Sequence, residues 1–128
     1  MSIDHTKILL LEDDVDLTEI IELIFEPEGF QVISSSVQSY LQDIEQHKPD
    51  IIIADHLLSN STTGSDICMA LKANPATAHI PFIITSAVYN LPDIAKECCA
   101  DGFIEKPFDI NYILKVVKDL LNSDSKSG

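Results

Sequence analysis

Four largely apolar runs in the chain each end at a side chain with useful chemistry, and this pattern constrains the fold more than any other feature. The runs are continuous rather than alternating, which is typical of strands buried on both faces of a parallel sheet. Because the carboxyl ends of parallel strands meet at one edge, we expect the side chains that follow the runs to gather there. Residues 8–11 precede Glu12 and Asp13, 51–54 precede Asp55, 82–85 precede Ser86, and 102–105 precede Lys106.

Helical patterns alternate with these runs. The first helical pattern, at residues 17–25, has apolar residues at i, i+3, i+4, i+7 and i+8, which form one face of an amphipathic helix. A further short strand is predicted at residues 30–33, after Pro27 and Gly29. The remaining helices are expected after Ser36 as a cap and ending before Pro49, around Ile67 and Leu71, from about Pro92 to Cys99, and after Asp109 as N-cap.

Five strand–helix units predict an α/β fold with one doubly wound, five-stranded parallel sheet in the order 2-1-3-4-5. Helices should cover both faces, as in flavodoxin-like proteins. A chain of 128 residues fits one domain with a single well-buried core. We expect an N-terminal extension at 1–6, the domain at 7–122 and a disordered tail at 123–128.

The charge balance limits the partners that the sequence predicts. The formal net charge is −13, whereas nucleic-acid binding needs a basic surface, so we expect no direct contact with nucleic acid. Anionic membrane surfaces are disfavoured for the same reason, and no apolar run approaches the ~20 residues of a membrane span. Three cysteines do not suit a disulfide framework, and the first residues lack a signal-peptide pattern. The expected location is therefore cytoplasmic.

The residues expected at the sheet edge suit a phosphoryl group bound beside a cation. Glu12, Asp13 and Asp55 repel one another, so the cluster needs a counter-cation, and an all-oxygen ligand set favours Mg²⁺. Lys106 adds a positive charge and Ser86 a hydroxyl donor. Aspartate can accept a phosphoryl group covalently, and Asp55 is the better acceptor because it stands alone at the end of the central strand.

These pieces together resemble the receiver domain of two-component response regulators, over roughly residues 7–121. The matching segments are 11–14 after the first strand, Asp55 after the third, Ser86 with Ala87 after the fourth, and 106–108 after the fifth. Each piece is a weak signal alone, and all four in order at strand ends are highly specific.

The resemblance implies that Asp55 is phosphorylated by a sensor histidine kinase or a histidine phosphotransfer protein. Mg²⁺ would be held by Asp13, Asp55 and the Leu57 carbonyl, with Glu12 acting through a metal-bound water. Ser86, with Ala87 beside it, and Lys106 would contact the phosphoryl oxygens, and Phe103 would turn inward behind Ser86. The face formed by the fourth helix, fifth strand and fifth helix would then bind a downstream protein or a second copy.

Several positions depart from the pattern of that family or stand out beside it. Gly64 lies one residue later than the usual glycine, and Cys99 stands where a helix-ending glycine is common. Leu57 and Val88 occupy positions that tune hydrolysis in the family. Because both are apolar, we expect a slowly hydrolysing phosphoryl-aspartate. His56 is expected to point away from the site as an ordinary loop residue.

Two other functions compete with this interpretation. Residues 14–18 match the Asp-x-Asp-x-Thr signature of haloacid-dehalogenase-type phosphatases, in which Asp14 would be the nucleophile, although Asp14 could equally cap the first helix. The chain could also be a receiver-like docking module that is never phosphorylated. If the chain is a receiver domain, we expect it to catalyse at most its own phosphorylation and dephosphorylation and not to be an enzyme otherwise.

Overall fold

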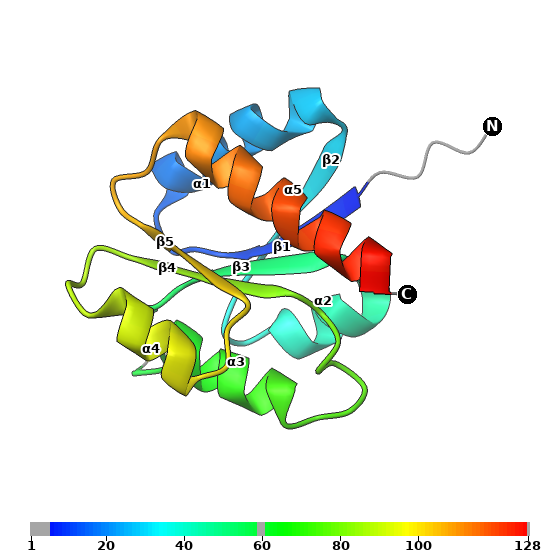
Figure 1. The fold of residues 1–128 in the computed structure, drawn as a ribbon, viewed down its shortest axis with the longest axis vertical. Coiled ribbons are helices and arrows are strands. Elements are labelled where there is room, and N and C mark those ends of the chain that lie inside the picture. Colours follow the sequence, from blue (N-terminus) through cyan, green and yellow to red (C-terminus); the bar gives the residue numbers. More distant parts are fainter. Residues whose placement is uncertain (1–5, 59–60, 128) are drawn as a thin grey trace.

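The computed structural model describes residues 6–58 and 61–127, with side chains described as far as residue 122. Five parallel strands form one sheet in the order β2-β1-β3-β4-β5, which confirms the predicted topology. Helices cover both faces of the sheet, with α1 and α5 on one side and α2, α3 and α4 on the other (Figure 1). The strands are β1 (Thr6–Leu11), β2 (Phe30–Ser35), β3 (Ile51–Asp55), β4 (Phe82–Ser86) and β5 (Gly102–Glu105).

The helices follow the strands in strict alternation. A short 3-10 turn, η1 (Glu26–Glu28), joins α1 to β2, and Gly29 closes it in the left-handed region with φ of 91°. The helices are α1 (Val15–Phe25), α2 (Tyr40–His47), α3 (Gly64–Lys72), α4 (Leu91–Glu97) and α5 (Ile110–Ser127).

Three predicted boundaries differ from the observed ones. Thr6 already belongs to β1, and residues 1–5 of the predicted extension lie outside the described residues. The helix predicted from Ser36 begins only at Tyr40, because the Ser36 carbonyl accepts the backbone N–H groups of Ser39 and Tyr40 in a turn. Residues 123–127, predicted as part of a disordered tail, continue the backbone of α5, since no Pro or Gly interrupts the helix there, and residue 128 lies outside the described residues.

The core consists of two apolar layers, one on each face of the sheet. Side chains of a strand point alternately to the two faces, so neighbouring residues of one strand enter different layers. In β3, Ile52 and Ala54 pack on the α2–α3–α4 side, whereas Ile51 and Ile53 pack on the α1–α5 side. This alternation continues to the strand end and decides which face each site residue occupies.

Within the described residues no helix is long and apolar enough to span a membrane.

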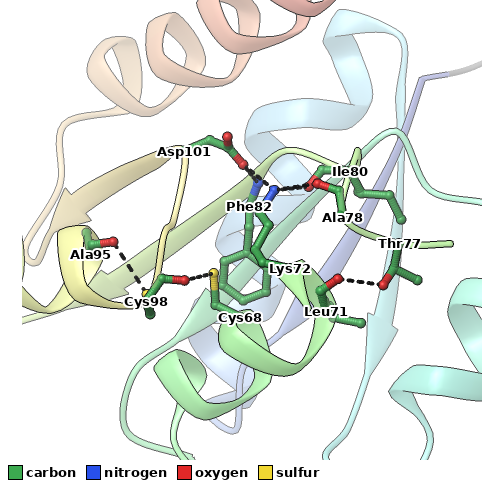
Figure 2. A network of polar contacts seen from close by, with 10 residues as sticks. All are labelled: Cys68, Leu71, Lys72, Thr77, Ala78, Ile80, Phe82, Ala95, Cys98 and Asp101. Atoms are coloured by element: carbon green, nitrogen blue, oxygen red, sulfur yellow. Dashed lines mark hydrogen bonds and ion pairs between the residues drawn. The ribbon is translucent and has the colours of Figure 1, made fainter. Parts of the chain in front are cut away.

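A lysine network fixes the amino-terminal ends of β4 and β5, at the edge away from Ser86 and Lys106. The Lys72 ammonium at the end of α3 donates to the carbonyls of Ala78 and Ile80, at 3.1 and 2.9 Å, and to Asp101 Oδ2 at 2.8 Å. The same Asp101 oxygen accepts the backbone N–H of Phe82 at 2.8 Å (Figure 2). The Lys72 side chain is only 16% exposed, so these four bonds hold the first residue of β4 and the approach to β5 in place.

Replacing Lys72 by methionine tests this network. The variant keeps the aliphatic stem but leaves two carbonyls and the Asp101 carboxylate without their shared donor. We expect the free energy of unfolding to fall by about 2–3 kcal/mol. Chemical denaturation followed by circular dichroism measures the change.

The matched control is Lys115→Met. Lys115 pairs with Asp119 at 2.6 Å on the surface of α5, where the two side chains are 70% and 60% exposed. Because solvent screens such a pair, the control should lose less than about 0.5 kcal/mol. Equal losses in the two variants would contradict the role assigned to the Lys72 network.

Candidate functional site

The ends of β1, β3 and β5 bring two carboxylates and one ammonium into direct contact. Lys106 Nζ lies 3.0 Å from Glu12 Oε1 and 3.3 Å from Asp55 Oδ2. The side chains are largely buried, with exposed fractions of 4% for Glu12, 12% for Asp55 and 21% for Lys106. The ammonium therefore stabilises two partly desolvated negative charges that would otherwise repel each other.

Glu12 is the most perturbed group of this cluster. Burial raises the pKa of its carboxyl group, and the nearby Asp55 charge adds to the rise. Hydrogen bonds from the Lys106 ammonium and from the Asp14 backbone N–H, at 3.0 and 3.2 Å, oppose it. Burial outweighs these bonds, so the site disfavours a further unpaired negative charge and favours an added cation.

Two neighbouring aspartates at the start of α1 have different environments. Asp13 follows Glu12 in the chain and is exposed to solvent. Asp14 is the N-cap of α1, because its Oδ1 accepts the Leu17 backbone N–H at 3.2 Å and its carbonyl accepts the Thr18 hydroxyl at 3.0 Å. Asp14 is therefore used as a helix cap, which is the structural alternative to a phosphatase nucleophile.

Ser86 closes the site on the β4 side. It is 1% exposed, its Oγ accepts the Val88 backbone N–H at 3.3 Å, and its carbonyl accepts the Lys106 N–H at 2.9 Å. Ala87, the next residue, is exposed, and the Lys106–Pro107 peptide bond is cis. The backbone bond ties the ends of β4 and β5, so that Ser86 and Lys106 are held as one unit.

Leu57 and Phe103 complete the predicted set. The Leu57 backbone N–H donates to Asp55 Oδ1 at 3.4 Å, so this backbone lies against the proposed acceptor, while the Leu57 side chain is 61% exposed. Phe103 is half-buried in β5 and packs against the core layer on the α2–α3–α4 side. It also lies beside α4, where it lines a groove with Pro92 and Ala95.

Gly64, at the β3–α3 junction, lies in close contact with the backbone of β3. The sequence showed only that its position is shifted by one residue. A Cβ atom built on Gly64 would overlap the Asp55 carbonyl oxygen and would lie 3.1 Å from the His56 Cα. Gly64 also donates its backbone N–H to the His56 carbonyl at 2.9 Å. Thr63 and Asp66 form a capping box immediately before this contact. The first turn of α3 can thus pack directly on the backbone of Asp55 because residue 64 has no side chain.

His56 differs from the expectation of an ordinary loop residue. Its backbone N–H donates to the Thr85 carbonyl at 2.8 Å, which extends the pairing of β3 and β4 by one residue. Its Nδ1 atom is buried and has no hydrogen-bond partner in the structure. Nothing in the sequence signals this burial, because it depends on tertiary packing after the end of β3.

The donor set fits a magnesium ion better than a transition metal. The acidic groups in contact with Lys106 are carboxylates, and the two carboxylates against one ammonium leave an excess of negative charge. Within the described residues no three His, Cys, Asp or Glu side chains form a preformed metal cage. Mg²⁺ commonly uses only one or two carboxylates and keeps several waters, so it does not need such a cage.

The chain belongs to the response regulator receiver domain family, whose model matches residues 8–118. Its relatives include response regulator ArlR of Staphylococcus saprophyticus, with 34% identity over 119 residues, which are 91% of this chain and 52% of ArlR. DNA-binding response regulator MtrA of Mycobacterium tuberculosis is 30% identical over 80% of this chain and 44% of MtrA. The chain thus spans about half the length of the curated relatives that it matches. Receiver domains of this family are signalling proteins of two-component systems and typically bind Mg²⁺ at the phosphorylation site.

Solved structures agree with this assignment. The receiver domain of a signal transduction histidine kinase from Syntrophus aciditrophicus has a TM-score of 0.83 and 30% identity, and covers 92% of this chain and 91% of that one. Chemotaxis protein CheY4 of Vibrio cholerae, at 18% identity, shares the fold with a TM-score of 0.81 over 91% of this chain and 98% of its own.

The exclusion of nucleic acid as a partner is wrong. MtrA is a DNA-binding response regulator, and another relative, RpaA of Synechocystis, is a DNA-binding dual master transcriptional regulator, at 28% identity over 90% of this chain. Related proteins therefore do bind nucleic acid. The error came from treating the net charge of one acidic domain as a limit on every protein that contains such a domain.

Replacing Gly64 by alanine tests the close contact on Asp55. The added methyl group must push α3 away from the Asp55 carbonyl oxygen, and backbone cannot yield as a flexible side chain can. We expect a loss of about 1–3 kcal/mol in unfolding free energy, together with weaker phosphorylation of the variant. Denaturant titration and labelling with acetyl phosphate measure the two effects.

Gly102→Ala is the matched control, because the nearest atom to its added Cβ would be the end of the flexible Leu120 side chain, at 3.3 Å. This variant should lose less stability than Gly64→Ala and keep normal labelling. If Gly64→Ala were as stable and as readily labelled as the control, the close contact would matter neither for stability nor for phosphorylation.

Proposed function

We propose that this chain is a phosphorylated receiver domain, in which a histidine kinase or a histidine phosphotransfer protein transfers a phosphoryl group to Asp55. The observation that carries the proposal is the position of the Lys106 ammonium, in contact with both Glu12 and Asp55 at the carboxyl edge of the sheet. An ammonium fixed beside a partly buried carboxylate can stabilise the charge of a phosphoryl group formed on that carboxylate.

The transfer needs little proton chemistry from the protein. An Asp55 carboxylate oxygen attacks the phosphorus of phosphohistidine, the P–N bond breaks, and the imidazole leaves with a proton. Lys106 would exchange its contact with Asp55 for one with a phosphoryl oxygen, while the buried Ser86 hydroxyl and the neighbouring Ala87 backbone would approach from β4. Positioning and charge stabilisation supply the catalysis, as in other phosphoryl transfers.

Mg²⁺ would be held by Asp13, Asp55 and the Leu57 carbonyl, with Glu12 acting through water, and would neutralise the charge of the phosphoryl oxygens. The excess of negative charge around Lys106 supports this assignment. On this proposal the protein catalyses only its own phosphorylation and dephosphorylation.

Phe103 is proposed as the element that passes the signal from the site. It lines an open groove of about 360 Å³ between α4, β5 and α5, together with Pro92, Ala95, Tyr112 and Val116. When Ser86 moves toward the phosphoryl group, the ring can turn inward behind it and change the shape of this groove. Such a local event biases a two-state surface element.

Asp55→Asn tests the proposal, because the amide cannot accept a phosphoryl group. We expect this variant to remain folded and to carry no phosphoryl label from either acetyl phosphate or a histidine kinase. Mass spectrometry after treatment with Mg²⁺ and acetyl phosphate, or with a histidine kinase and ATP, locates the adduct.

Asp14→Asn is the control, since asparagine caps helices as well as aspartate does and should leave α1 intact. The receiver proposal requires full labelling of this variant. Loss of label there, with label retained in Asp55→Asn, would favour the phosphatase reading. Absence of any label in the folded wild-type protein would favour a docking module that is never phosphorylated.

The lifetime of the phosphoryl group can be tested at Leu57 and Val88. Leu57 is 61% exposed and Val88 is half-buried, and neither side chain can orient an attacking water. We expect slow loss of label from the wild type, and loss about tenfold faster in Leu57→Asn or Val88→Asn, which corresponds to about 1.4 kcal/mol of barrier. Leu57→Met should behave as the wild type, and rapid loss that polar substitutions leave unchanged would contradict the expectation.

A further inference from the structure

His56 holds the one buried side-chain nitrogen or oxygen atom without a hydrogen-bond partner among the residues that the structure describes. That atom is Nδ1 of its imidazole ring. A buried polar atom without a partner costs free energy comparable to a lost hydrogen bond, so such an atom calls for an explanation. Its position directly after Asp55 makes a role at the phosphorylation site the first to consider.

The sheet register places His56 beside Ser86. Asp55 pairs with Thr85, and the His56 backbone N–H donates to the Thr85 carbonyl, so residues 56 and 86 follow as neighbours across the two strands. Side chains alternate along a strand, and Ala54 and Ile84, two positions earlier in each strand, both pack on the α2–α3–α4 side. Carried one residue past Asp55 by the backbone bond to Thr85, this alternation puts the His56 side chain on the same face of the sheet as that of Ser86.

Ser86 has a hydroxyl proton to donate. Its Oγ accepts the Val88 N–H at 3.3 Å, which is long for such a bond, and no acceptor for the hydroxyl appears among the hydrogen bonds of the described residues. The residue is 1% exposed, so solvent gives little compensation. Ser86 at the end of β4 thus has a hydroxyl proton without an acceptor, and His56, the residue after β3, has a buried ring nitrogen without a partner.

We propose that Nδ1 of His56 accepts the Ser86 hydroxyl proton while Asp55 is unphosphorylated, and that His56 thereby holds Ser86 back from the phosphoryl site. The two groups are not bonded in this structure, so the bond requires a change in a side-chain torsion of His56 or Ser86. The inference rests on the proposed function, in which Ser86 binds a phosphoryl oxygen. His56 is then a positioning residue that acts through Ser86.

This arrangement makes His56 a competitor of the phosphoryl group for one donor. A bond present only in the unphosphorylated state lowers the fraction of protein whose Ser86 is ready for a phosphoryl oxygen. Removing the acceptor should therefore favour the phosphorylated arrangement. The size of the effect is that of one net hydrogen bond, about two- to tenfold in an equilibrium constant.

Beryllofluoride, which mimics a phosphoryl group on aspartate, measures this equilibrium in the whole chain with Mg²⁺ present. His56→Phe keeps a planar ring but has no acceptor, and we expect it to bind beryllofluoride about two- to tenfold more tightly than the wild type. His56→Asn places an amide oxygen near the position of Nδ1, and should restore affinity close to that of the wild type. Weaker or unchanged affinity in a folded His56→Phe protein overturns the proposal.

The Ser86→Ala background separates positioning from a general structural effect. If His56 acts through the hydroxyl, His56→Phe should have no effect on beryllofluoride affinity once Ser86 is alanine. The same increase in both backgrounds would show that the ring acts by another route.

A second measurement needs neither phosphorylation nor a stable His56 variant. In the ¹⁵N spectrum of the wild type at fixed alkaline pH, Nδ1 of His56 should be unprotonated and hydrogen-bonded, and its resonance should move in Ser86→Ala. A proton on Nδ1, or a resonance that stays unchanged, overturns the proposal even when Asp55 accepts phosphate. Normal ¹⁵N behaviour combined with no labelling of Asp55 would instead reject the proposed function alone.

Discussion

The contact of one ammonium with two carboxylates is the interaction on which the site depends. Lys106 comes from the loop after β5, Glu12 from the end of β1 and Asp55 from the end of β3, so the contact joins three strands that are distant in sequence. Without Lys106, two largely buried carboxylates would face each other across the middle of the sheet, and the rise in the pKa of Glu12 would increase. The ion pairs therefore stabilise an arrangement that is electrostatically unfavourable for the carboxylates alone, while Lys106 retains enough exposure for a new oxygen ligand to reach it.

Much of the fold and the position of the site could be predicted from the sequence, because both follow from the parallel strands. Once residues 51–54 are a buried strand, Asp55 must stand at its carboxyl end, and the same reasoning places Glu12, Ser86 and Lys106. Local details were harder to predict. Serine is a common residue type at helix N-caps, which led to the prediction of a cap at Ser36. The Ser36 carbonyl instead closes a turn, and α2 begins four residues after Ser36, at Tyr40. The burial of His56 could not be predicted, because the alternation of side chains places its ring on one face of the sheet only if the position where β3 ends is known.

The net charge of one domain was a poor guide to the partners of larger proteins that contain such a domain. Net charge acts through the field at the surface of the molecule that carries it, so the value of −13 bears on this domain alone. At the site the same excess of acid has a specific arrangement, and there it supports a conclusion about cation binding. The DNA-binding relatives show why composition of one domain does not extend to the partners of a larger protein.

The anchoring of β4 determines how a change at Asp55 can reach the rest of the molecule. Its first residue is held by the Asp101 carboxylate, which Lys72 fixes in turn, and its last is held by the Lys106 N–H on the Ser86 carbonyl. A strand bonded to both neighbours and fixed at both ends cannot slide as a unit without breaking buried hydrogen bonds. In the proposed function, a response at Ser86 would therefore pass through its side chain and the loop that follows, which leads into α4 at Leu91. On this proposal the rigid strand would direct the change toward the start of α4, where Pro92 lines the same groove as Phe103.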